Sequence, residues 1–131
     1  MTVQRPLVAV LAVATLGTLA APATAAVIKP PPLLRVVATE YKFALGKTVV
    51  APGPRSIALV NNGTKRHDLV LRRLNAAGSP VGAPLTLPRV AAGKQAKRTF
   101  TLVVGRYSMV CTISDHAALG MTARLTVRKP R

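Results

Sequence analysis

Short apolar runs separated by turn-forming residues follow one another along most of this chain, and this pattern limits the folds open to it more than any other feature. Clusters of glycine, proline and asparagine lie between the runs, for example at residues 52–54 and 61–63, and such clusters favour turns. No stretch keeps helical spacing over three turns. The pattern therefore predicts an all-β protein, a Greek-key β-sandwich of about seven to eight strands. The expected strands are residues 33–39, 41–45, 55–61, 67–73, 98–104, 107–111 and 122–128.

Two segments refine this expectation. In the last run, Ala123, Leu125 and Val127 share one face while the residues between them are polar, which is typical of a half-buried antiparallel strand. Residues 75–95 are rich in alanine, proline and glycine. We expect them to form a long crossover connection between the two sheets, with at most a short strand at residues 85–87.

The N-terminus has the features of a secretory signal peptide. Arg5 precedes an apolar stretch at residues 7–21, and small residues follow Pro22. The alternative, an uncleaved membrane anchor, needs a longer uninterrupted apolar run. We therefore divide the chain into a signal peptide, residues 1–26, and one domain, residues 27–131, and we expect an exported protein that is periplasmic or extracellular.

Composition restricts the available chemistry. Half of the 131 residues are hydrophobic, which supports one compact domain and argues against a disordered basic tail. The chain has no tryptophan, two histidines and one cysteine, so it cannot form an internal disulfide. A lone cysteine in an exported protein is a partner-seeking thiol, an inert core residue or a metal ligand.

The residues around this cysteine favour the metal ligand. Cys111, His116 and Met121 follow one another at intervals of five positions on one predicted loop. A thiolate, an imidazole and a thioether suit copper and poorly suit calcium or magnesium. His67, the other histidine, begins a predicted strand, and strand parity lets it point between the sheets as Cys111 does. Taken singly, a cysteine or methionine is more often a buried core residue, but together these four residues complete a His2Cys site with a weak axial methionine.

In these segments the sequence resembles the cupredoxins, the small blue copper proteins, and the ligand spacing is most similar to that of the rusticyanin and sulfocyanin group. The resemblance covers most of residues 27–131. It departs from the family at Ser114 and Asp115, where many members have proline and glycine before the loop histidine. The motifs that carry it are Gly105-x-Tyr107-x3-Cys111-x4-His116-x4-Met121 and Asn61-x-Gly63-x3-His67-Asp68.

The resemblance implies one type 1 copper ion held by His67, Cys111, His116 and Met121, and a protein that carries single electrons between redox partners. It is not expected to be an enzyme, because both histidines are assigned as ligands and none remains for acid–base chemistry. The alternative function is copper storage, delivery or resistance without an electron-transfer partner.

Three further residues acquire expected roles from the same resemblance. Asp68 is expected to hydrogen-bond to Thr112 and so to join the two ligand-bearing segments, the alternative being a solvated carboxylate. Tyr107 resembles the tyrosine corner that ties a loop to the backbone, and we assign it no role as a ligand.

The charge suggests the kind of partner. The chain has 19 basic and 3 acidic residues, and a net charge of +16. An acidic redox protein or another anionic surface is the expected partner of a monomer. Nucleic acid is not expected, because the charges are scattered, aromatic residues are scarce and no helix is available to enter a major groove.

Overall fold

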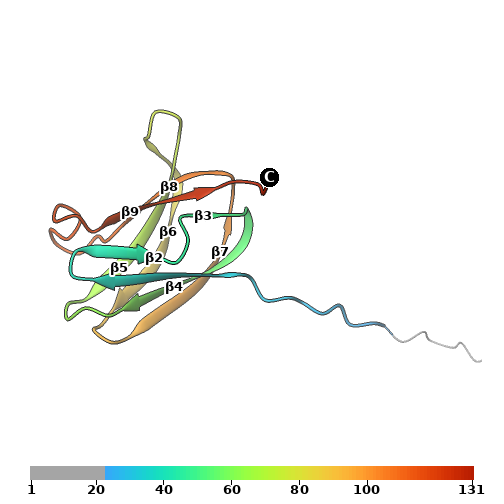
Figure 1. The fold of residues 1–131 in the computed structure, drawn as a ribbon, viewed down its shortest axis with the longest axis horizontal. Coiled ribbons are helices and arrows are strands. Elements are labelled where there is room, and N and C mark those ends of the chain that lie inside the picture. Colours follow the sequence, from blue (N-terminus) through green and yellow to red (C-terminus); the bar gives the residue numbers. More distant parts are fainter. Residues whose placement is uncertain (1–22) are drawn as a thin grey trace, which may run out of the picture.

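The computed structural model describes residues 23–131. The apolar stretch predicted to be part of a signal peptide, residues 7–21, lies outside the described residues. Residues 23–32 are extended and form no strand, and they project from the sandwich at the right of Figure 1. No helix in the described part of the chain is long and apolar enough to span a membrane.

Residues 23–131 form nine strands in two sheets, which pack as a β-sandwich (Figure 1). The order is β2-β1-β4-β7 in the first sheet and β3-β9-β8-β5-β6 in the second. Both sheets are mixed, because β1 pairs with β4 and β3 with β9 in parallel, whereas the other pairs are antiparallel. The strands are β1 (Leu33–Thr39), β2 (Lys42–Leu45), β3 (Val49–Val50), β4 (Gly53–Asn61), β5 (His67–Leu74), β6 (Pro80–Val90), β7 (Gln95–Leu102), β8 (Gly105–Val110) and β9 (Thr122–Val127).

This architecture confirms the predicted all-β sandwich, and each of the seven predicted runs overlaps a strand. The alternation predicted for the last run is also confirmed, since Leu125 and Val127 are buried while Arg124 is exposed. The prediction for residues 75–95 is wrong in part. The chain does pass from the second sheet to the first between β6 and β7, but most of the segment is β6, an 11-residue strand.

The position of β6 explains why its composition was misleading. It is the edge strand of its sheet and pairs only with β5. A proline whose nitrogen faces the open side of an edge strand leaves no sheet hydrogen bond unmade, so prolines that would disrupt a central strand are tolerated there. Gly82 takes a φ of 72°, and the pairing with β5 is irregular between Leu71 and Arg73. A strand with such bends shows no clean period-2 pattern in its sequence.

The core lies between the sheets, and the alternation of its side chains sets which residues at the strand ends face inward. Inward-facing side chains alternate along each central strand, as Leu69 and Leu71 do on β5 and Tyr107 and Met109 on β8. Continuing this parity by two positions places His67 and Cys111 on the buried face. The predicted inward orientation of both residues is thus confirmed.

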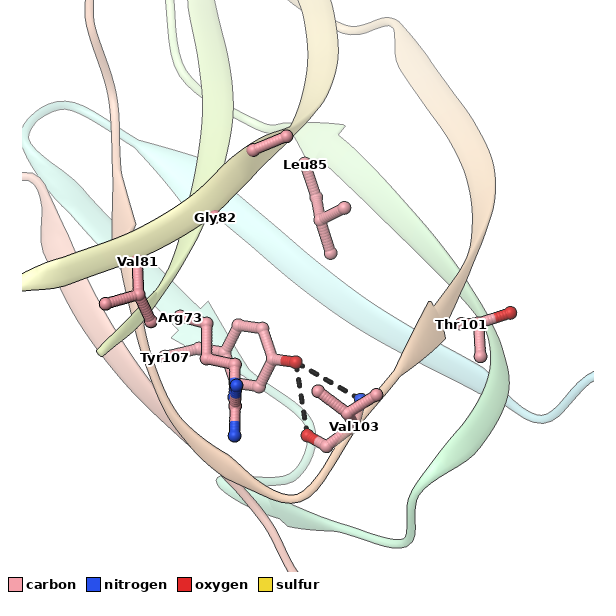
Figure 2. Close-up of a pocket in the computed structure, with 8 residues that line it drawn as sticks. Arg73, Val81, Gly82, Leu85, Thr101, Val103 and Tyr107 are labelled. Carbon is pink, nitrogen blue, oxygen red and sulfur yellow. Dashed lines mark hydrogen bonds between the residues drawn. The ribbon is translucent and has the colours of Figure 1, made fainter. Parts of the chain in front are cut away.

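Tyr107 fixes the other end of β8. Its ring is buried, and its hydroxyl donates to the carbonyl of Val103 at 3.1 Å and accepts from the Val103 amide at 3.2 Å (Figure 2). These two bonds close the turn between β7 and β8 and confirm the predicted tyrosine corner. The pocket drawn in Figure 2 is lined in part by Tyr107 of β8, whereas Cys111 follows the end of that strand.

Candidate metal centre

Three connections meet at one end of the sandwich, at the left of Figure 1. They are the β1–β2 turn, the β4–β5 loop and the β8–β9 loop. His67 is the first residue of β5, Cys111 follows β8 directly, and His116 lies in the β8–β9 loop. Residues far apart in the sequence are therefore brought to the same end of the molecule.

His67, Cys111 and His116 form one buried cluster. Each offers a ligand atom, and these atoms all lie within 4.8 Å of one another. The Cys111 Sγ is 3.5 Å from Nδ1 of His116, and the two imidazole ring centroids are 5.1 Å apart. Two imidazoles and a thiol at such distances form the donor set of a soft or borderline metal ion, so these residues make a potential copper site.

The hydrogen bonding of His67 supports metal binding there. Within residues 23–131, neither ring nitrogen of this fully buried imidazole has a hydrogen-bond partner. A buried polar atom left unpaired costs about 1–3 kcal/mol, and a bound metal ion would satisfy one of the two nitrogens. The donor set and the unpaired imidazole therefore fit the copper ion that the sequence resemblance implies.

Burial also sets the protonation of the cluster. It lowers the pKa of His67 and raises the pKa of the Cys111 thiol, because desolvation disfavours the charged form of each group. A neutral imidazole is ready to bind a metal, whereas the thiol must lose its proton when the metal binds.

Met121, the fourth predicted ligand, is fully buried beside this cluster. Its backbone amide donates to the carbonyl of His116 at 2.9 Å, and its carbonyl accepts from the Cys111 amide at 3.2 Å. The methionine is thus tied to both loop ligands through the main chain. Its role as a weak fourth ligand stays a prediction.

The β8–β9 loop is well ordered by hydrogen bonds although it lacks the proline and glycine of many cupredoxins. The His116 amide donates to the carbonyl of Ile113 at 3.1 Å, and the Leu119 amide donates to the carbonyl of Asp115 at 3.0 Å. Ser114 lies inside the first of these two turns and has a φ of 47°. These main-chain hydrogen bonds restrain the part of the loop that carries His116.

Asp68 joins the two segments that carry His67 and Cys111, as predicted. Its Oδ1 accepts from the backbone amide of Thr112 and its Oδ2 from the Thr112 hydroxyl, both at 2.6 Å. Only 8% of the Asp68 surface is exposed, so the alternative of a solvated carboxylate is wrong. This clamp holds the first histidine and the cysteine in fixed relation.

Asn61, part of the motif quoted above, organises the β4–β5 loop. Its buried amide nitrogen donates to the carbonyls of Lys65 and Val90 at 2.7 and 2.8 Å, and its Oδ1 accepts from the Gly63 amide at 2.9 Å. These bonds fix the loop that delivers His67 to the cluster.

No protein-family model and no curated protein matches the sequence, but solved structures resemble this one over most of its length. Reduced auracyanin from Roseiflexus castenholzii aligns with a TM-score of 0.61 and 20% identity, over 76% of this chain and 99% of that protein. Auracyanin A, a "blue" copper protein from Chloroflexus aurantiacus, aligns with a TM-score of 0.60 and 21% identity, over 76% of this chain and 100% of the other. The protein has the cupredoxin fold.

Rusticyanin from Thiobacillus ferrooxidans also has a similar structure. It aligns with a TM-score of 0.54 and 21% identity, over 76% of this chain and 79% of rusticyanin. This likeness is consistent with the predicted resemblance to the rusticyanin group.

The sequence did not predict two residues that border the candidate metal centre, Glu40 and Tyr41 in the β1–β2 turn. The Glu40 Oε1 lies 3.5 Å from Nε2 of His67, outside hydrogen-bond geometry. The Tyr41 ring packs edge-on against the His116 imidazole, with centroids 5.1 Å apart. The turn is distant from both histidines in the sequence, so no motif spacing could connect them. The one available signal was that the chain has only 3 acidic residues.

Backbone donors stabilise the charged form of Glu40. The amides of Lys65 and Thr64 donate to its Oε1 at 2.9 and 2.7 Å. The hydrogen bond from Lys65 is the largest cause of a pKa lowered to about 2, and Thr64 acts in the same direction. Glu40 is therefore a carboxylate at neutral pH, and its negative charge lies beside His67.

Proposed function

We propose that this protein is an exported blue copper protein that carries single electrons between redox partners, and that it is not an enzyme. The observation that supports this most is the buried cluster of His67, Cys111 and His116, whose ligand atoms lie within 4.8 Å of one another. In this proposal the cluster binds one copper ion, and Met121 is a weak fourth ligand. Copper bound there supplies one-electron chemistry by alternating between Cu(I) and Cu(II).

The role of the protein is to keep the ligands in one arrangement during electron transfer. The clamp between Asp68 and Thr112 and the main-chain bonds from Met121 to Cys111 and His116 restrict movement of the ligands. Little rearrangement then accompanies the gain or loss of an electron. The burial of Cys111 excludes water from the thiolate.

His116 is the proposed route for the electron. Its side chain is nearly buried, with 6% of the residue exposed, and Leu119 of the same loop is 51% exposed. Ala118 is exposed beside it. A small apolar surface around a ligand histidine lets a partner approach closely without displacing charged groups and their water.

Cycling of the bound metal distinguishes the electron carrier from the alternative of copper storage or delivery. The carrier should complete repeated oxidation and reduction in voltammetry with its copper retained in the presence of a competing Cu(I) chelator. Rapid loss of Cu(I) to the chelator, with no reversible couple, would favour delivery and contradict the carrier.

Replacing Met121 with leucine should raise the reduction potential and leave copper bound. The substitution removes a weak donor that favours Cu(II), while the volume of the buried side chain is nearly kept. A tenfold loss of preference for Cu(II) over Cu(I) raises the reduction potential of a one-electron couple by about 59 mV. Voltammetry measures this shift. A lower potential, or loss of copper, would show that Met121 is not a weak ligand.

The proposed partner is an acidic redox protein, because the chain carries a net charge of +16. Lys65 and Arg66 are exposed in the β4–β5 loop at the metal end, whereas Arg128 and Lys129 follow β9 at its other end. If an acidic partner docks at the metal end, the cations next to His67 should contribute more to its association than the cations at the opposite end.

Reversing the charges of Lys65 and Arg66 to glutamate should therefore slow electron transfer to an acidic partner more than the same reversal of Arg128 and Lys129. The rate should also fall steeply as salt shortens the Debye length from ~30 Å at 0.01 M to ~10 Å at 0.1 M. Stopped-flow kinetics measures both effects. The two double variants change the net charge equally, so equal slowing would contradict docking at the metal end.

A further inference from the structure

One short turn contacts both histidines of the candidate metal centre. Glu40 and Tyr41 connect β1 to β2. The carboxylate of Glu40 is 3.5 Å from His67, and the ring of Tyr41 lies at 71° to the His116 imidazole. The metal centre is therefore bordered by a turn whose residues belong to neither ligand-bearing segment.

The backbone of this turn is unusual. Tyr41 has a φ of 58°, a left-handed conformation that is rare for a bulky aromatic residue. Strained backbone of this kind persists only where the surrounding structure holds it, and it clusters at functional sites. This conformation places the Tyr41 ring against the His116 imidazole.

The Glu40 carboxylate is held in one place. Its Oε1 accepts from the amides of Thr64 and Lys65 and from the Thr64 hydroxyl, at 2.7, 2.9 and 3.4 Å. The absence of a side chain at Gly63 makes room for it, because a Cβ there would lie 2.9 Å from both Cδ and Oε2 of Glu40 and closer still to Oε1. An anion fixed by several donors can orient the imidazole that it faces.

We propose that Glu40 is a positioning residue of the metal centre: its carboxylate faces Nε2 of His67, leaves Nδ1 as the atom that binds the metal, and favours the oxidised ion. This inference rests on the proposed copper function. Imidazole ligands commonly donate their second ring N–H to a carboxylate or carbonyl, which fixes the ring and makes it a stronger donor. Here a modest closure of the 3.5 Å gap forms that bond.

The simpler alternative is that Glu40 only fastens the β4–β5 loop to the β1–β2 turn. Glu40→Gln separates the two roles, because the amide oxygen of glutamine still accepts from Thr64 and Lys65 while the negative charge is lost. A residue that only fastens the loop would leave the potential of this variant unchanged.

We expect Glu40→Gln to lower the affinity for Cu(II) by about 10-fold, the lower end of the effect of such outer partners, with a smaller loss for Cu(I). The reduction potential should rise in consequence. Competition titrations and voltammetry measure the two quantities, and the hyperfine splitting in electron spin resonance reports the changed copper environment.

Gly63→Ala provides a second variant that keeps the charge. The added methyl group displaces the Glu40 carboxylate without backbone strain, since Gly63 is not among the residues with a positive φ. Its potential should shift in the same direction as that of Glu40→Gln. Asp115→Asn is the matched control, because it removes one negative charge from an exposed position next to His116 in the loop, and its shift should be smaller.

The outcomes separate this inference from the proposed function. If the wild-type protein binds no copper, both fail. If it forms a blue site while Glu40→Gln and Gly63→Ala keep its potential and spectrum, or while Asp115→Asn shifts the potential as much as Glu40→Gln, only the role of Glu40 is overturned. In the metal-free protein, 15N NMR should find the His67 proton on Nε2, and a proton on Nδ1 would also contradict the inference.

Discussion

Replacing Cys111 with serine should abolish the intense visible absorption expected of the oxidised, copper-loaded protein. That absorption requires charge transfer from a thiolate sulfur to Cu(II), and Cys111 is the only cysteine in the chain. Serine is close in size to cysteine, so the buried position after β8 keeps its packing. Absorption spectra of the two proteins at equal copper content measure the loss, which should be complete.

Met109→Leu is the matched control for this variant. Met109 is fully buried on the same face of β8, two positions before Cys111, and leucine nearly keeps its volume. This control should retain the colour. An intense band that survives in Cys111→Ser would show that the thiolate is not a ligand, and the proposed site would fail with it.

Replacing Asp68 with alanine should lower copper affinity by about 10 to 100-fold without removing any ligand. Both carboxylate oxygens accept hydrogen bonds from Thr112 at 2.6 Å. Their loss leaves the Thr112 amide without its partner and frees the segment of Cys111 from the segment of His67. Competition titration measures the affinity, and broader electron spin resonance lines should report the less uniform site.

Asp68→Asn tests whether the hydrogen bonds or the charge matter. Its amide can still accept from the Thr112 amide and can donate to the Thr112 hydroxyl, so the connection remains while the charge is lost. We expect most of the affinity to be kept. Equal affinity in wild type and Asp68→Ala would remove Asp68 from any role in holding the ligands.

The arrangement of the core and of the paired ligands was predictable because it depends on strand parity. His67 and Cys111 lie on the faces set by Leu69 and Met109, and period 2 fixes that relation along any regular strand. The clamp from Asp68 to Thr112 was predictable from the resemblance to the cupredoxins, because each of the two residues directly follows an expected ligand. Local spacing in the sequence thus carries over to the structure.

The parts that could not be predicted depend on relations between distant segments. The edge strand β6 contains prolines that are tolerated only because one side of the strand has no partner, and the sequence does not say which strand is at an edge. Glu40 meets His67 because β1 pairs with β4 in parallel and with β2 through a tight turn. Neither pairing is visible in the residues of that turn.

The measurement that tests the account most directly is the visible absorption and electron spin resonance of the copper-loaded protein. We predict one copper ion per chain, an intense band from thiolate to Cu(II) charge transfer, and a small copper hyperfine splitting, since His67, Cys111 and His116 converge within 4.8 Å in a buried cluster. Copper bound with only a weak band and an ordinary hyperfine splitting would contradict the proposed blue copper site.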